Sequence, residues 1–92
     1  MSQKRVIVTV IGEDRVGIIA AVTEVLAKYQ VNILDISQTI LQDFFTMMMI
    51  VDISKSTVSL QSLQDILKTL GDNIGMQIQA QHEDIFRFMH RI

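Results

Sequence analysis

The first third of the chain opens with a run rich in β-branched residues and then changes to helical spacing. Residues 5–11 read RVIVTVI, and this run of β-branched residues predicts a strand. Turn-forming residues at 12–17 (GEDRVG) end the strand. A helix is expected from Ile18 to Tyr29, because apolar residues recur there every three or four positions. Asp14 stands where an N-cap would stand, with a carboxylate able to accept the first free amides.

The middle of the chain predicts two more strands. Residues 31–41 form an extended stretch in which three apolar residues fall on one face and Ile33 falls on the other, so we expect a β-bulge. Gln42 and Asp43 then form a turn. Residues 44–53 are apolar at both odd and even positions, which predicts a strand buried on both sides.

The last third predicts a helix, a strand and a terminal helix. Ser59 is a good N-cap for an amphipathic helix over residues 60–70, and Gly71 is expected to close that helix. Residues 76–81 alternate apolar side chains with glutamine, the pattern of a strand with one wet face. From Glu83 onward, apolar residues return at helical spacing and indicate a short C-terminal helix.

The order of these elements predicts an α+β fold, the ferredoxin-like βαββαβ sandwich. Its four-stranded antiparallel sheet has the helices on one face, and an extra helix follows at the C-terminus. A chain of 92 residues provides one domain, residues 1–92. The face of the sheet without helices would carry Ile7, Ile11 and part of 44–53, which is too apolar to leave in water. We therefore expect a homodimer through the sheet or its edge.

Composition and charge exclude several classes of function. The net charge of −2 offers no attraction to nucleic acid or to an anionic membrane, so we expect neither as a partner. The chain has no cysteine, which excludes disulfides and thiolate chemistry, and we see no signal peptide or membrane-spanning run, so we expect a cytoplasmic protein. His82 and His90 lie far apart in sequence, and we expect no metal and no cofactor.

One loop and the strand after the first helix carry a family resemblance. Residues 12–18 (GEDRVGI), followed by Val31-Asn32-Ile33, resemble the signature of the ACT domain. Residues 35–39 (DISQT) and 44–48 (FFTMM) further resemble short, free-standing ACT-domain proteins of bacteria and archaea, which are similar to the ACT modules of glycine-cleavage repressors. The resemblance implies a ferredoxin-like, non-enzymatic regulatory module that binds an amino acid or a related metabolite. It also implies a regulated protein partner.

The same loop, which we expect to lie near the homodimer interface, offers a physical case for a ligand site. The amides near Val16, Gly17 and Ile18 stand at a helix N-terminus, where they could receive a carboxylate. Asp14 could meet an α-ammonium group. We expect Asn32 to lie beside the loop, where its side-chain amide could both donate and accept hydrogen bonds. The candidate ligand-binding residues are therefore Asp14, Arg15, Val16, Gly17, Ile18, Asn32 and Ile33.

Structural explanations and other functions stay open at this point. Asp14 could be a cap alone, Gly17 could serve backbone geometry, and Asn32 could cap a helix end or a turn. A protein–protein interaction module without a small ligand would rely on the apolar sheet face instead. An acylphosphatase-like hydrolase would use Arg15 and Asn32, but the neighbouring acidic side chains would repel an acyl phosphate.

Overall fold

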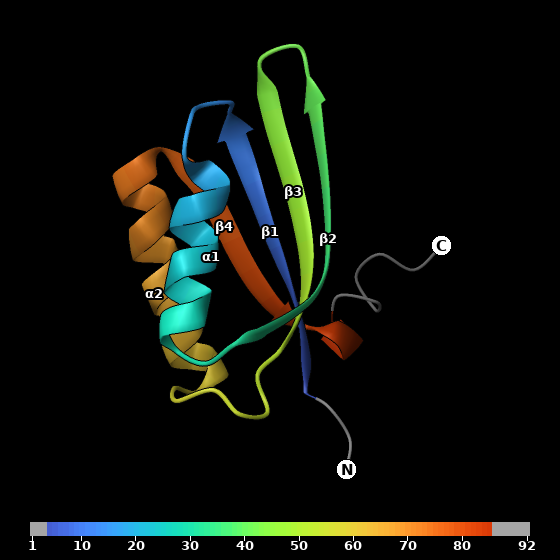
Figure 1. Cartoon of the computed structure of the whole chain (residues 1–92), viewed down its shortest axis with the longest axis vertical. Helices are drawn as coiled ribbons and strands as arrows, with labels where there is room; N and C mark the ends of the chain where they lie inside the picture. Colours follow the sequence, from blue (N-terminus) through green and yellow to red (C-terminus); the bar gives the residue numbers. More distant parts are fainter. Residues whose placement is uncertain (1–3, 86–92) are drawn as a thin grey trace.

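The computed structural model describes residues 4–85 and shows a sheet with two helices on one of its sides (Figure 1). The elements are β1 (Arg5–Glu13), α1 (Ile18–Lys28), β2 (Asn32–Leu41), β3 (Phe44–Asp52), α2 (Leu60–Ile74) and β4 (Met76–His82). The strands pair antiparallel in the order β2-β3-β1-β4, which confirms the ferredoxin-like prediction. Residues 83–85 are helical, as the prediction of a C-terminal helix requires, and its remaining residues lie outside the described part.

The core lies between the helices and one face of the sheet. Every second residue of the central strands points into it, and the helices contribute residues three or four positions apart. The fully buried side chains are Val6, Val8, Val10, Val22, Leu26, Met47, Met49, Val51, Leu63 and Leu67. The apolar side chains spaced by two in the strands and by three or four in the helices all meet in this core. The hydrophobic pattern of the sequence therefore specifies the fold.

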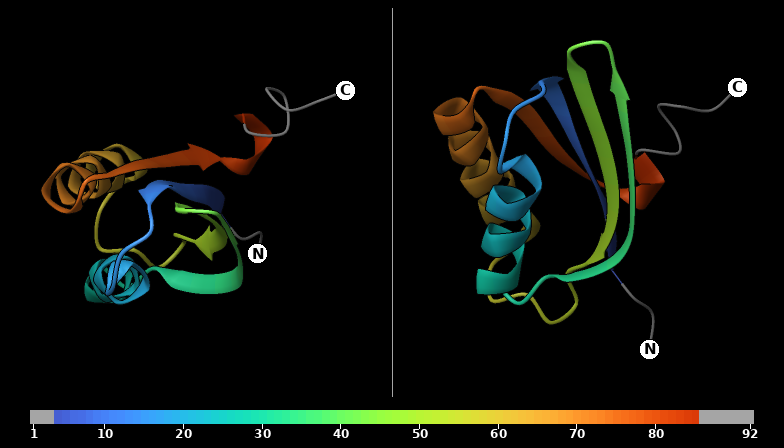
Figure 2. Two further views of the ribbon diagram at one scale, coloured as in Figure 1. Left: turned by 90° about the horizontal axis from the view of Figure 1, so that it is seen from above. Right: turned by 45° about the horizontal axis from the view of Figure 1, so that its top comes forward.

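β3 is buried on one face only. Its residues Phe45, Met47, Met49 and Val51 point into the core, whereas the intervening Phe44 is 60% exposed. The prediction of a strand buried on both sides is therefore wrong for the single chain, because α1 and α2 lie on the same side of the sheet (Figure 2). The other side, which we call the open face, keeps apolar side chains in contact with solvent.

β2 contains the predicted bulge. The pairing with β3 shifts between Ile33 and Asp35, so Leu34 is the extra residue. The shift puts Ile33 and Ile36 on the same face of the sheet, because both pair with core residues of β3. The imperfect alternation of the sequence is thus explained by one inserted residue.

The two ends of α2 turn out differently. The Ser59 hydroxyl accepts a hydrogen bond from the Ser62 amide at 3.2 Å, which confirms the predicted N-cap. The prediction that Gly71 closes the helix is wrong, because α2 continues to a left-handed C-cap at Gly75, with φ of 74°. Gly71 instead allows α2 to pass close to the backbone of β4, since a Cβ there would lie 2.5 Å from the Met76 carbonyl oxygen.

Asp52, at the end of β3, gives the fold one expected dependence on pH. Its carboxylate accepts the amides of Ser54 at 3.0 Å and Lys4 at 3.2 Å, and the Ser54 amide is the main cause that lowers the pKa of Asp52 from 3.8. A carboxyl group whose pKa is lowered by folding stabilises the protein above its unfolded pKa, and this contribution is lost as the pH falls through the folded pKa.

We therefore expect Asp52→Asn to be less stable than the wild type at neutral pH. The difference should shrink as the pH falls from 3.8 through the lower pKa of the folded protein, because the carboxylate is then protonated first in the unfolded and next in the folded state. Urea unfolding of both proteins at pH 7 and near pH 3 measures it. A difference of the same size at both pH values would contradict the prediction.

Candidate functional site

The loop between β1 and α1 is held at two points. The Asp14 amide donates to the Asp43 carbonyl in the β2–β3 turn at 2.8 Å. The Arg15 guanidinium donates through Nη1 to the Ile74 carbonyl at 2.7 Å. Ile74 is the last residue of α2, so Arg15 satisfies a carbonyl that has no partner within the helix and places a positive charge at its negative end. The loop is thereby fixed against the C-terminal end of α2.

α1 begins without a side-chain cap. Its N-cap residue is Gly17, with φ of 88°, and no side chain hydrogen-bonds to the first turn. The prediction that Asp14 is the N-cap is wrong, because two more loop residues separate it from the left-handed turn at Gly17. A Cβ on Gly17 would meet nothing within 4 Å, so no neighbouring atom requires a glycine there. The glycine is needed for its positive φ angle. The first amides of α1 therefore stay open to a ligand.

A small cup opens at this uncapped helix end. It has a volume of about 130 Å³ and is lined by Arg15, Val16, Gly17, Ile18, Asn73 and Ile74. The loop and α1 form one wall, and the last turn of α2 forms the other. Since a water molecule occupies about 30 Å³ of liquid, the cup has room for about four waters. The cup is therefore small.

The structure brings only part of the predicted site together. Four predicted residues, Arg15 to Ile18, line the cup, while Asp14 belongs to the same loop but not to the lining. Asn73, which the sequence analysis missed, lines the opposite wall. Asn73 lies beyond the predicted helix end at Gly71, and only Gly75 gave a signal that the helix could continue past it.

Asn32 lies at the opposite end of the sheet from the loop. It pairs with Asp52, which in turn pairs with Arg5 at the start of β1, whereas the loop follows the end of β1. Along the nine residues of β1 this separation is about 26 Å at 3.3 Å per residue. The expectation that Asn32 stands beside the loop is therefore wrong within one chain, and its neighbour Ile33 shares the distant position.

Two larger hollows lie away from the cup. One of about 500 Å³ runs between α2 and β4, and one of about 400 Å³ lies beside Gly12 and Gly75 at the ends of β1 and α2. Neither is lined by the first turn of α1. Within residues 4–85, no three side chains are grouped as metal ligands. In the same part of the chain, no helix is long and apolar enough to cross a membrane.

The chain belongs to the ACT domain family, whose sequence model matches residues 4–81. ACT domains are regulatory modules that often bind amino acids. A UPF0237 protein of Methanosarcina acetivorans is 51% identical over 92 residues, the full length of both chains.

Two solved structures resemble the fold. An ACT domain protein from Streptococcus pneumoniae is 35% identical with a TM-score of 0.81, and the match covers 92% of this chain and 96% of that one. A putative glycine cleavage system transcriptional repressor has a TM-score of 0.76 at 22% identity, covering 88% of this chain and 46% of that one. The second likeness shows the fold alone. The family resemblance of the sequence is confirmed.

Proposed function

We propose that this protein is a non-enzymatic regulatory module that binds an amino acid or a similar small zwitterion in the cup beside α1. The observation that carries the proposal is the uncapped first turn of α1, which opens into a cup of about 130 Å³. Unpaired amides and the positive end of a helix dipole stabilise a carboxylate at such a position. Catalysis is not needed to explain any residue of the cup.

The two walls of the cup have opposite polarity. The first turn of α1 presents N–H groups, while α2 ends beside it with Asn73 and the carbonyl groups of its last turn. A helix carries partial positive charge at its N-terminus and partial negative charge at its C-terminus. A zwitterion would therefore place its carboxylate at α1 and its ammonium group at α2. Arg15 already donates to the Ile74 carbonyl, so the ammonium group would use the other polar groups of this wall.

Ligand binding would act through a population shift in a homodimer. The open face exposes Ile11, Phe44 and Met48, and exposed apolar groups of this kind mark surfaces that associate. A ligand that binds one dimer arrangement more tightly than another shifts the equilibrium toward it, and a partner protein then detects the change.

Calorimetry with Asn73→Ala tests the site. Titration of the wild type with the common amino acids should give saturable binding of at least one of them. The variant should bind that ligand about tenfold to a hundredfold more weakly, since a hydrogen bond to a charged group contributes about 1.5–3 kcal/mol. Asn32→Ala is the matched control, because Asn32 is an exposed asparagine outside the cup, and it should bind as the wild type does.

The open face also favours a second function, an interaction module without a small ligand. In that case a folded wild-type protein would give no heat with any amino acid. Silence across the panel would contradict the ligand site. Equal weakening in both asparagine variants would place the ligand somewhere other than the cup.

A further inference from the structure

A second hollow, which we call the glycine hollow, lies where the ends of β1 and α2 meet the start of β4. Its volume of about 400 Å³ falls within the range of about 300–1,000 Å³ that is typical of small-molecule sites. Its lining differs from that of the cup at every residue. The glycine hollow is therefore a separate candidate for a ligand site.

The glycine hollow continues from α2 across the end of the sheet to the open face. Gly71 and Asp72 line it from α2, and Ile11 and Phe44 line it from the open face. Gly12 lies between them at the end of β1, where a Cβ would lie 2.5 Å from Met76 Sδ and 3.1 Å from the Gly75 carbonyl oxygen. The absence of a side chain on Gly12 thus keeps the two halves of the hollow connected.

The half of the hollow at the open face is apolar. Ile11 is 46% exposed and Phe44 is 60% exposed. The pairing of β1 with β3 makes these two residues diagonal neighbours on the open face. An apolar ligand that covers them removes hydrocarbon surface from water, which is favourable.

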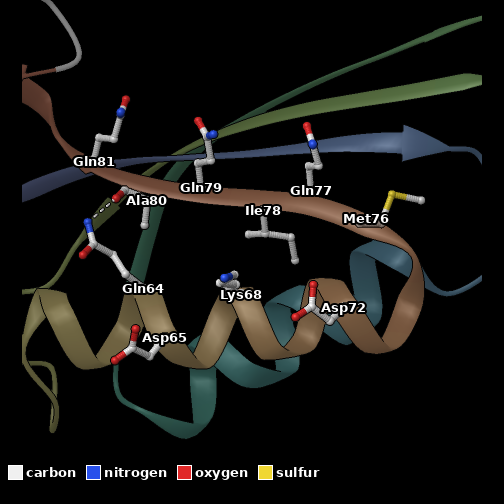
Figure 3. Close-up of a pocket in the computed structure, with 10 residues that line it drawn as sticks. All are labelled: Gln64, Asp65, Lys68, Asp72, Met76, Gln77, Ile78, Gln79, Ala80 and Gln81. Atoms are coloured by element: carbon white, nitrogen blue, oxygen red, sulfur yellow. Dashed lines mark hydrogen bonds between the residues drawn. The ribbon is translucent and has the colours of Figure 1, made fainter.

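The half of the hollow at α2 is negatively charged. Figure 3 shows the Asp72 carboxylate on the side of α2 that faces β4. Asp72 makes no ion pair within residues 4–85. The last turn of α2, residues 71–74, reads GDNI and has no basic residue of its own at the negative end of the helix dipole. A cation beside Asp72 is therefore stabilised by the carboxylate and by the helix end together.

The charges around the hollow favour the same sign of ligand. Glu13 ends β1, and the Asp14 amide donates to the Asp43 carbonyl oxygen at 2.8 Å, so further carboxylate residues stand at this end of the sheet. Arg15 opposes them with a positive charge, but its guanidinium is bound to the Ile74 carbonyl in the lining of the cup. The surrounding field favours a cation in the hollow over an anion.

We propose that the glycine hollow binds an organic cation with one ammonium group and an apolar body, of the class of the primary alkylamines. The ammonium group donates to the Asp72 carboxylate and to the Gly75 carbonyl oxygen. The hydrocarbon body crosses the end of β1 at Gly12 and lies against Ile11 and Phe44. This site is additional to the zwitterion site of the proposed function, since the two share no lining residue.

Three probes that differ at one end test the charge requirement. Hexylamine, hexanol and hexanoate are titrated into the full chain at pH 7 and followed by NMR. An alkylamine is protonated at this pH, as a lysine side chain is. Hexylamine should bind saturably and about tenfold more tightly than hexanol, because only the ammonium makes charged hydrogen bonds, and hexanoate should bind most weakly. The amide signals of Gly12 and Gly75 should shift during the titration with hexylamine.

Three variants locate the amine. Asp72→Asn should weaken hexylamine binding about tenfold and leave hexanol binding unchanged. Asp65→Asn is the matched control and should bind as the wild type does, because Asp65 lies earlier on α2 and lines the groove between α2 and β4 instead. Phe44→Ala should weaken hexylamine and hexanol by the same factor, since it removes apolar surface and no charge.

The results that would overturn the proposal are distinct. Equal affinities for hexylamine and hexanol, or no saturable binding of hexylamine, would do so. Equal losses in Asp65→Asn and Asp72→Asn would place the amine in the groove between α2 and β4. Asn73→Ala should leave the hexylamine affinity unchanged, and a loss there would place the amine in the cup. The amino acid titrations of the proposed function stand or fall independently of these results.

Discussion

Phe45→Ala should lower the free energy of unfolding by about 3–5 kcal/mol, the cost of removing a buried phenylalanine side chain and leaving a cavity. Phe45 is 3% exposed and belongs to the core between the sheet and the helices. A domain of 92 residues has a total stability of about 5–14 kcal/mol, so this one substitution removes a large share of it. Urea unfolding followed by circular dichroism measures the change.

Phe44→Ala is the matched control for this prediction. Phe44 precedes Phe45 in β3 but points to the open face, where it is 60% exposed. Its removal should change the stability by about 0.5 kcal/mol or less at protein concentrations low enough to keep the chain monomeric. Equal losses in the two variants would contradict the assignment of the two residues to opposite faces of the sheet.

Gly71→Val should lower the free energy of unfolding by about 3 kcal/mol, near the upper end of the usual cost of overpacking. An added Cβ would lie 2.5 Å from the Met76 carbonyl oxygen and 3.3 Å from Ile78 Cγ1, so α2 would have to move away from β4. The first neighbour is a backbone atom, which cannot turn aside as a flexible side chain could. Thermal and urea unfolding measure the loss.

Thr69→Val tests whether the effect comes from position 71. Thr69 is exposed on the same helix, so Thr69→Val introduces the same residue type at an exposed position. Its effect should stay within about 0.5 kcal/mol. A Gly71→Val protein as stable as the wild type would contradict the close approach of α2 to β4.

The sequence alone was enough for most of the fold. The period of two in 5–11 and 76–81 and the helical period in 60–70 are local consequences of backbone geometry, and each predicted element is present, although α2 continues to Ile74. The break in alternation after Ile33 was enough to predict the bulge. Ser59 could be identified as a cap because an N-cap bonds to an amide only a few residues away.

The site needed more than local pattern. The loop residues Arg15 to Ile18 could be proposed from sequence, but Asn73 enters the cup from α2, more than fifty positions away in the chain. The sequence pattern around Gly71 also predicted a helix end. A glycine that ends a helix and a glycine that lets a neighbouring backbone pack closely cannot be distinguished from the sequence alone. The neighbour that distinguishes them comes from β4.

The periodicity of the residues thus determined which segments are helices and strands and which of their faces are apolar. Only the tertiary structure decided which apolar face is covered and which helix and strand ends lie next to one another. α1 returns the chain along the whole sheet, so β2 starts where β1 starts, and Asn32 lies far from the loop. Both helices pack on one side, which leaves Phe44 in solvent and Phe45 in the core. Such contacts depend on the direction in which each connection runs, and the spacing of residues along the chain does not determine that direction.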